Sequence, residues 1–121
     1  MRNVYFLIGL VTLINSAPAI GSDDLSSEQL KLEQLLSGAK LEGIYLRTHS
    51  PYTLIFDADG SLKNQRGATG RWWVNAKGQY CRQWETGKLK GHQACLDLAV
   101  ESEGVSIYSR GKRVAEGELK R

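Results

Sequence analysis

The sequence has 121 residues and carries sixteen Lys and Arg against thirteen Asp and Glu, which gives a formal net charge of +3. This mild basic excess argues against dedicated nucleic-acid binding, for which a pronounced basic stripe is expected. The length is enough for one domain with one modest hydrophobic core rather than for several domains.

The start of the sequence has the pattern of a secretory signal peptide. A short positive segment, 1–3, is followed by a charge-free apolar run over 4–14 and by Ala17-Pro18-Ala19, which matches a small-residue cleavage site. The run is shorter than the roughly 20 residues that a transmembrane helix needs, which disfavours an uncleaved anchor. We expect cleavage after Ala19, or alternatively after Gly21. The remaining single domain, 20–121, should be periplasmic or secreted, with no stable membrane insertion.

A short helix is predicted near the start of this domain, over about 26–37. Ser26 can cap its N-terminus with Gln29 as the reciprocal partner, and Gly38 can end it. A hydrophobic staple is offered by Leu25 and Leu30, and an apolar stripe consists of Leu32, Leu35 and Leu36. Such a stripe is more typical of core packing than of a partner groove, so the helix should plug one end of the sheet or pack on its edge.

The rest of the chain alternates β-type segments with turn signals every eight to twelve residues or so, a rhythm typical of a meander, sandwich or small barrel. The predicted strands run over 41–47, 52–56, 61–66, 71–75, 79–84, 94–100, 105–109 and 114–119. One strong turn signal is Asp57 to Gly60, where the glycine can take a positive φ. We therefore predict a mainly β fold, an antiparallel meander of about seven to eight strands that forms a small barrel or a sandwich.

The two cysteines lie on the strands predicted over 79–84 and 94–100. Because side chains alternate along a strand, both cysteines leave the apolar face. If the two strands pair, Cys81 and Cys95 face each other on the outer face, within disulfide reach. We predict a Cys81–Cys95 disulfide, as is usual for two cysteines in an exported chain. Free thiols and metal ligation are the alternatives, disfavoured because a CxxC motif and paired zinc-type spacings are missing from the sequence.

Aromatic and basic residues concentrate in the stretch 70–95, which holds all three tryptophans. The candidate binding residues are Arg71, Trp72, Trp73, Tyr80, Arg82 and Trp84. Trp72 and Trp73 face opposite sides of their strand, so one should enter the core while the other faces out or lies at a rim. Trp73 and Arg71 share one side and could form a contact patch with Arg82 and Trp84 near the barrel mouth. The alternative is that both adjacent tryptophans pack, one of them under the helix.

Arg82 is the unusual residue of this set, because it falls on the apolar face together with Tyr80 and Trp84. An unpaired buried guanidinium is costly. We therefore expect Arg82 at the barrel mouth with its stem over Trp84, or stacked on an aromatic ring.

The sequence contains no set of residues that predicts catalysis, metal binding or a cofactor. The two histidines, His49 and His92, are expected at the surface. Asp57 and Asp59 flank a turn but lack the further oxygen ligands and the closing Glu of a calcium loop. We expect no catalytic residues, no metal ligands and no cofactor.

Several short motifs follow one another in a fixed order: Phe56-Asp57-Ala58-Asp59-Gly60, then Gly70-Arg71-Trp72-Trp73-Val74 (G-x-W-x-V), then Cys81-Arg82-Gln83-Trp84 (C-x-x-W), then Cys95. This order resembles a group of small exported proteins of Gram-negative bacteria that are classed as domains of unknown function. The resemblance spans 36–108 and implies a periplasmic or secreted β domain. It implies no activity and assigns no functional residue.

Two classes of function fit these features. We predict a non-enzymatic binding or accessory module of the cell envelope, whose partner is another envelope or secreted protein. The alternative is a carrier of a small apolar ligand, with Trp72, Tyr80 and Trp84 lining a pocket inside a β-barrel. An enzyme is the least favoured class.

Overall fold

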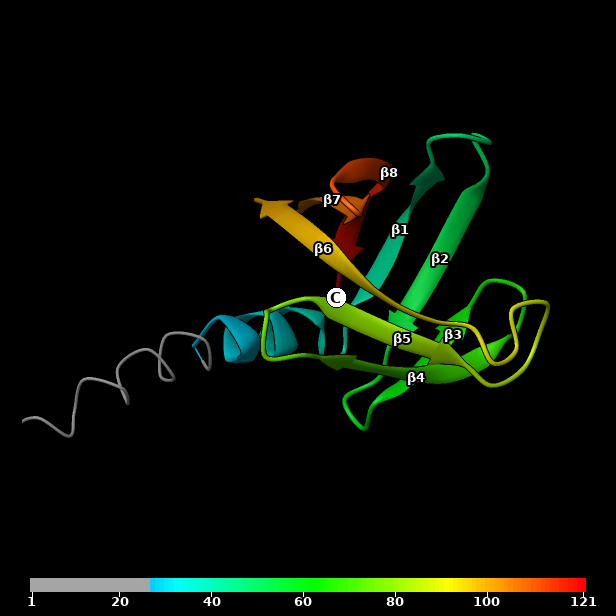
Figure 1. The fold of residues 1–121 in the computed structure, drawn as a ribbon, viewed down its shortest axis with the longest axis horizontal. Coiled ribbons are helices and arrows are strands. Elements are labelled where there is room, and N and C mark those ends of the chain that lie inside the picture. The colour runs from blue at the N-terminus through cyan, green and yellow to red at the C-terminus, as the bar shows by residue number, and fades with distance from the viewer. Residues whose placement is uncertain (1–26) are drawn as a thin grey trace, which may run out of the picture.

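The computed structural model describes residues 27–121 as a closed, eight-stranded antiparallel barrel with one helix at one end (Figure 1). The predicted signal peptide, Leu25 and Ser26 lie outside the described residues. The strands are β1 (Lys40–Tyr45), β2 (Pro51–Phe56), β3 (Ser61–Asn64), β4 (Thr69–Val74), β5 (Tyr80–Trp84), β6 (Gln93–Glu101), β7 (Gly104–Ser109) and β8 (Lys112–Lys120). Each strand pairs with the next, and β8 pairs with β1, so the predicted meander forms a barrel and not a sandwich.

Facing glycines form the seam that closes the barrel between β1 and β8. Gly43 lies opposite Gly117. A Cβ atom on Gly117 would lie 2.6 Å from the carbonyl oxygen of Glu42, and one on Gly43 would overlap the carbonyl oxygen of Glu116. Since only glycine lacks this atom, the two residues allow β1 and β8 to approach closely. Gly43, within the first predicted strand, is therefore part of the closure.

The helix, 27–36, covers the end of the barrel where β2 turns into β3 and β4 turns into β5 (Figure 1). Gly38 ends the helix with φ +80°, and its N–H donates to the carbonyl of Phe56 at 2.7 Å. Gln29 donates through Nε2 to the carbonyl of Val74 at 2.9 Å, which ties the helix to the end of β4. Leu36 is fully buried, as the predicted apolar stripe requires, whereas Leu30 is 55% exposed. The leucine proposed for a hydrophobic staple therefore lies at the surface.

The core fills the barrel interior with side chains from every strand, and Leu98 and Val100 of β6 pack against it while partly buried. Its buried members are Leu36, Ala39, Leu41, Tyr52, Leu54, Phe56, Leu62, Trp72, Val74, Tyr80, Trp84, Leu96, Val105, Ile107, Ala115 and Leu119. Phe56 stands at its centre and meets the rings of Trp72 and Tyr80 edge to face, at centroid distances of 5.5 and 5.4 Å. Strand alternation places these residues on the inner face, which is why the period-2 pattern of the sequence predicted the core.

The predicted disulfide is present between β5 and β6. Cys81 and Cys95 are directly opposite in the strand register, and their sulfur atoms are bonded. Cys81 lies on the outer side of β5 with Trp73 of β4 as its other neighbour. It is nevertheless fully buried. Cys95 is exposed, so the bond joins a covered residue of β5 to the outer surface of β6.

Candidate functional site

A cavity of about 1050 Å³ opens at the end of the barrel opposite the helix. The loops 46–50, 65–68 and 85–92 surround its mouth, and the ends of β1, β2, β3 and β5 form its walls. Tyr45, Tyr52, Leu54 and Trp84 supply its apolar surface. Pockets that bury drug-sized ligands measure roughly 300–1,000 Å³, so this cavity has room for a small organic molecule.

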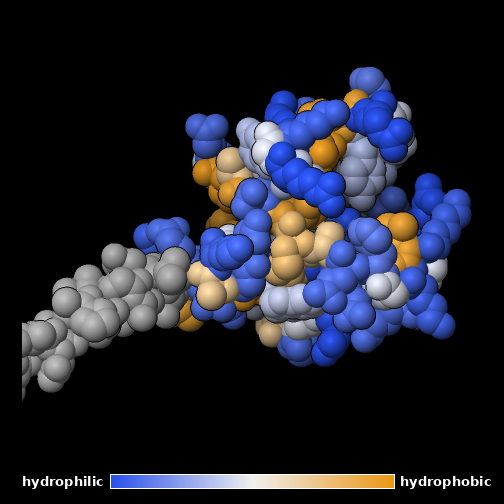
Figure 2. All heavy atoms as spheres, viewed as in Figure 1, coloured by the Kyte–Doolittle hydropathy of each residue, from blue (hydrophilic) through white to orange (hydrophobic). Residues whose placement is uncertain are grey.

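Two large apolar side chains at this mouth remain in contact with solvent. Tyr45 is 41% exposed and Leu89 is 50% exposed, and both line the cavity. Hydrophilic residues cover most of the face in Figure 2, and apolar residues form separate small areas among them. Exposed apolar groups that gather around a hollow are typical of a binding site.

The charge around the cavity has one sign. Arg47, Arg66 and Lys88 line it, and all three side chains are exposed. No Asp or Glu of the described residues is among the lining side chains. The mouth therefore attracts anions and repels cations.

A row of polar groups runs down the inner face of β5, from the cavity wall into the barrel. Strand alternation places Trp84, Arg82 and Tyr80 in this order from the mouth inward. Of the three, only Trp84 lines the cavity. Within the described part of the chain, Trp84 Nε1, Arg82 Nε and the Tyr80 hydroxyl are all buried and have no hydrogen-bond partner. Tyr80 is 0% exposed and Trp84 is 4% exposed, whereas Arg82 as a residue stays partly exposed. Each buried group without a partner lowers the stability of the fold by about 1–3 kcal/mol. Three such groups in one row are unusual for a purely structural core.

Tyr45 and Tyr52 lie close to this row. Their ring centroids are 4.7 Å apart. Burial raises the pKa of Tyr52 well above its usual value, and the neighbouring phenols of Tyr45 and Tyr80 act in the same direction. Burial also raises the pKa of Tyr80 to about 12, opposed by the positive charge of Arg82. Tyr52 and Tyr80 therefore stay neutral at physiological pH.

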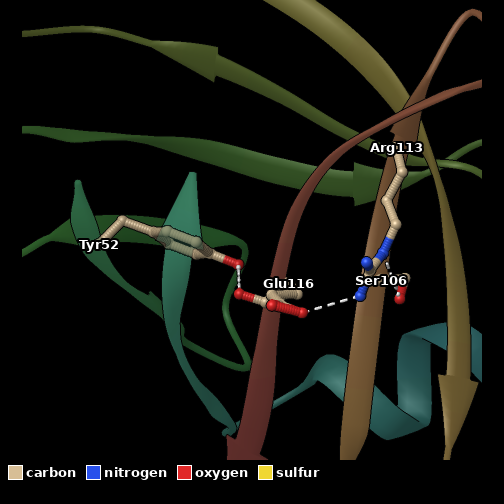
Figure 3. A network of polar contacts seen from close by, with 4 residues as sticks. All are labelled: Tyr52, Ser106, Arg113 and Glu116. Carbon is tan, nitrogen blue, oxygen red and sulfur yellow. Dashed lines mark hydrogen bonds and ion pairs between the residues drawn. The ribbon is translucent and has the colours of Figure 1, made fainter. Parts of the chain in front are cut away.

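Tyr52 is held in place from the far side of β1. Its hydroxyl donates to the carbonyl oxygen of Glu116 on β8 at 3.3 Å, and Figure 3 shows the side chain crossing the strand between them. Gly43 pairs with Tyr52 on one side and with Gly117 on the other, so the missing side chain leaves room for the ring. The Glu116 carboxylate is engaged elsewhere, since Arg113 Nη2 donates to it at 2.8 Å while Arg113 Nε donates to Ser106 at 3.2 Å (Figure 3).

The structure separates the six residues singled out by sequence into two groups. Trp72, Tyr80, Arg82 and Trp84 face inward, with Trp72 Nε1 donating to the carbonyl of Asp57 at 2.9 Å. Arg71 and Trp73 lie on the outer face of β4, where Arg71 forms an exposed ion pair with Glu85 at 3.5 Å. The single contact patch suggested for Arg71, Trp73, Arg82 and Trp84 is therefore divided by the barrel wall.

Two shallow hollows flank Trp73 on the outside, with volumes of about 390 and 440 Å³. The first lies between this ring and the helix, where Leu30 and Gln34 form the opposite wall. The second continues toward Arg71 and the β2–β3 turn at Asp59. Trp73 is half-buried and Trp72 is in the core. This agrees with the expectation that one tryptophan of the pair enters the core while the other lies at a rim.

Sequence reasoning missed the cavity residues outside the central stretch. Tyr45 and Tyr52 reach the site because β1 and β2 flank the mouth, and Arg47, Arg66 and Lys88 reach it because three loops meet there. A signal was present in the period-2 placement of Tyr52, Leu54 and Phe56 on one face. The convergence of the loops depends on barrel closure, which no local pattern encodes.

Residues 27–121 were searched for metal-binding clusters and for membrane-spanning helices. No group of three or more His, Cys, Asp and Glu side chains gathers there in a way that could hold a metal ion, and His49 and His92 are both exposed. No helix in this range is long and apolar enough to cross a membrane. Comparison of the sequence with models of protein families and with curated proteins found no match.

Proposed function

We propose that this chain is an exported binding protein without enzymatic activity, and that the barrel mouth holds a small, largely apolar ligand. The observation that carries the proposal is the cavity of about 1050 Å³ at one end of a barrel whose other end is covered by the helix. Its wall combines three aromatic side chains with Leu54, which suits an apolar body. The geometry thus favours the carrier over the envelope partner module as the first function to test.

Tryptophan fluorescence offers a direct test, because Trp84 lines the cavity while Trp73 lies on the outer face. Titration with a panel of apolar and haem-like ligands should quench or shift the emission and should saturate at one ligand per chain. The response should disappear in Trp84→Phe and persist in Trp73→Phe. A panel without any saturable response, or a response that depends on Trp73 alone, would contradict the proposal.

Export is supported by the signal-peptide pattern of the sequence together with the disulfide, since such bonds persist mainly in oxidising compartments. Expression of the full sequence in a Gram-negative host should yield a periplasmic or secreted product whose mass corresponds to cleavage after Ala19 or Gly21. A cytoplasmic product that retains residue 1 would contradict export.

A second candidate function is recognition of an envelope or secreted protein by the outer face of β4. The two hollows beside Trp73 favour it, because an exposed Arg and a half-buried Trp next to a hollow are typical of interface anchors. Affinity capture from envelope extract should then retain a stoichiometric partner that is lost with Trp73→Ala and with Arg71→Ala. Retention that is insensitive to both variants would refute this face as the interface.

A further inference from the structure

The three unpartnered groups on β5 share one chemical property. Arg82 Nε, the Tyr80 hydroxyl and Trp84 Nε1 are all hydrogen-bond donors, and none has a partner among the described residues. A guanidinium and an indole N–H cannot accept hydrogen bonds, so Arg82 Nε and Trp84 Nε1 can be satisfied only by acceptor atoms, whereas the Tyr80 hydroxyl can either donate or accept. The ligand that fits it carries acceptors at the end that enters the barrel.

The charges point to the sign of that acceptor group. Arg82 forms no ion pair within the described part of the chain, and no Asp or Glu in that part lines the cavity. Glu116, whose backbone carbonyl accepts from Tyr52, has its carboxylate already bound to Arg113. Arg82 is partly exposed, but its Nε is buried without a partner, which is unfavourable alone and favourable with an anion.

We propose that the ligand carries an oxyanion headgroup, such as a carboxylate, that binds between Arg82 and Tyr80 inside the barrel while its apolar body lies against Tyr45, Tyr52 and Leu54. This inference rests on the proposed function, since it names the chemistry of the ligand for the same cavity. Arg82 donates to the headgroup, Tyr80 adds a neutral donor, and Trp84 donates to an oxygen nearer the mouth.

The two sets of basic residues then have different roles. Arg47, Arg66 and Lys88 surround the mouth in contact with solvent, so they raise the rate at which an anion enters, in a way that salt screens. Arg82 has its Nε buried, so it controls how long the headgroup stays. A headgroup that remained at the rim would leave the three donors on β5 unsatisfied.

Three probes of equal chain length separate these possibilities by isothermal titration calorimetry below their micelle concentrations. They are dodecanoate, which is anionic, dodecanol, which is neutral, and dodecylammonium, which is cationic. Because a hydrogen bond to a charged group contributes about 1.5–3 kcal/mol, dodecanoate should bind at least about tenfold more tightly than dodecanol. Dodecylammonium should bind most weakly of the three.

Variants then locate the headgroup. Arg82→Met keeps the aliphatic stem of the side chain and removes its charged guanidinium, so it should abolish the preference for dodecanoate over dodecanol. It should also raise the melting temperature of the ligand-free protein, because a buried Nε without a hydrogen-bond partner is removed. A merely structural arginine would instead lower the melting temperature when replaced. Tyr80→Phe, which deletes only one oxygen, should weaken dodecanoate several-fold and serves as the second variant if Arg82→Met does not fold.

Arg71→Met is the matched control, since Arg71 lies on the outer face of the strand next to β5 and should leave all three affinities unchanged. Equal affinity for dodecanoate and dodecanol, in the wild type and in Arg82→Met, would overturn the inference and leave the proposed cavity function standing. A preference that survives Arg82→Met but is lost in Arg47→Gln and Arg66→Gln would place the headgroup at the rim and also overturn it. No binding of any probe, with the fluorescence panel silent as well, would refute the cavity function itself.

Discussion

Opening the disulfide should remove a large part of the stability of this domain. Cys81 and Cys95 are separated by 14 residues, and the bond between them closes a loop over β5, the 85–92 segment and the start of β6. In the chain-entropy account, a loop of about fifteen residues contributes roughly 3 kcal/mol by restricting the unfolded chain. Total stabilities of small domains are about 5–15 kcal/mol, so the loss should lower the melting temperature by roughly 12–24 °C.

The assay is urea unfolding followed by circular dichroism, with three samples: the oxidised protein, the reduced protein and Cys81→Ala/Cys95→Ala. The reduced protein isolates the cross-link and should lose roughly 3 kcal/mol. The double variant should lose about 1 kcal/mol more, because Cys81 is fully buried and its replacement leaves a void. Reductant should not change the double variant. A loss below about 1 kcal/mol on reduction would refute the reasoning, because the loop would then already be ordered in the unfolded chain.

Three further outcomes are expected. Gly43→Ala should destabilise the protein by about 2–3 kcal/mol or more in urea unfolding, because a Cβ there overlaps the backbone of β8. Gly104→Ala should cost about 1 kcal/mol or less, because a Cβ there lies 3.4 Å from the carbonyl oxygen of Glu101. Equal effects of the two variants would contradict the closure of the seam. Burial raises the folded-state pKa of Tyr80 to about 12, above the unfolded value near 10. The contribution of Tyr80 to the free energy of unfolding should therefore be complete below about pH 10 and fall by about 3 kcal/mol as pH rises toward 12. A Tyr80→Phe variant that lost as much stability over this pH range would argue against Tyr80 as the cause. Arg121→Ala should loosen the end of the helix, because the Arg121 guanidinium donates to the carbonyls of three residues at that end. Hydrogen exchange of the 27–36 amides should accelerate by roughly tenfold, and Lys112→Ala should leave it unchanged. Unchanged exchange in Arg121→Ala would show that the contact does not stabilise the helix.

Strand positions were the most predictable part of this fold. All eight predicted strands are present, with bounds that differ by a few residues at their ends, because each carries a period-2 apolar pattern between turn residues. The turn at Asp57 to Gly60 forms as expected, with Gly60 at φ +96° and the Asp59 carboxylate accepting from the N–H of Ser61 at 2.9 Å. The disulfide was equally predictable, since it needed only that β5 and β6 pair in register.

Barrel closure and the helix contacts could not be read from local patterns. The choice between barrel and sandwich depends on β8 meeting β1, which is decided by two glycines more than seventy residues apart in the chain, Gly43 and Gly117. At the C-terminus, Lys120 pairs with Glu42 at 2.9 Å and Arg121 binds the helix end. These contacts join distant segments, so their partners become evident only in three dimensions.

The candidate site was half predictable for the same reason. Alternation along β5 placed Tyr80, Arg82 and Trp84 on the inner face, and the structure has them there without partners for their buried donors. What alternation could not tell is that the loops 46–50, 65–68 and 85–92 converge to leave a cavity above Trp84. The outer-face residues Arg71 and Trp73 seemed to belong to the same patch only because sequence distance does not reveal the barrel wall between them.

The indole N–H signals of the three tryptophans provide the most direct test of ligand binding inside the barrel. In a two-dimensional NMR titration of the ¹⁵N-labelled oxidised protein with dodecanoate, the Trp84 signal should shift and saturate at one equivalent, because its unpartnered N–H gains an acceptor. The Trp73 signal, on the outer face, should stay in place. A titration that moves Trp73 while Trp84 is unchanged, or that moves neither, would contradict a ligand site in the barrel mouth.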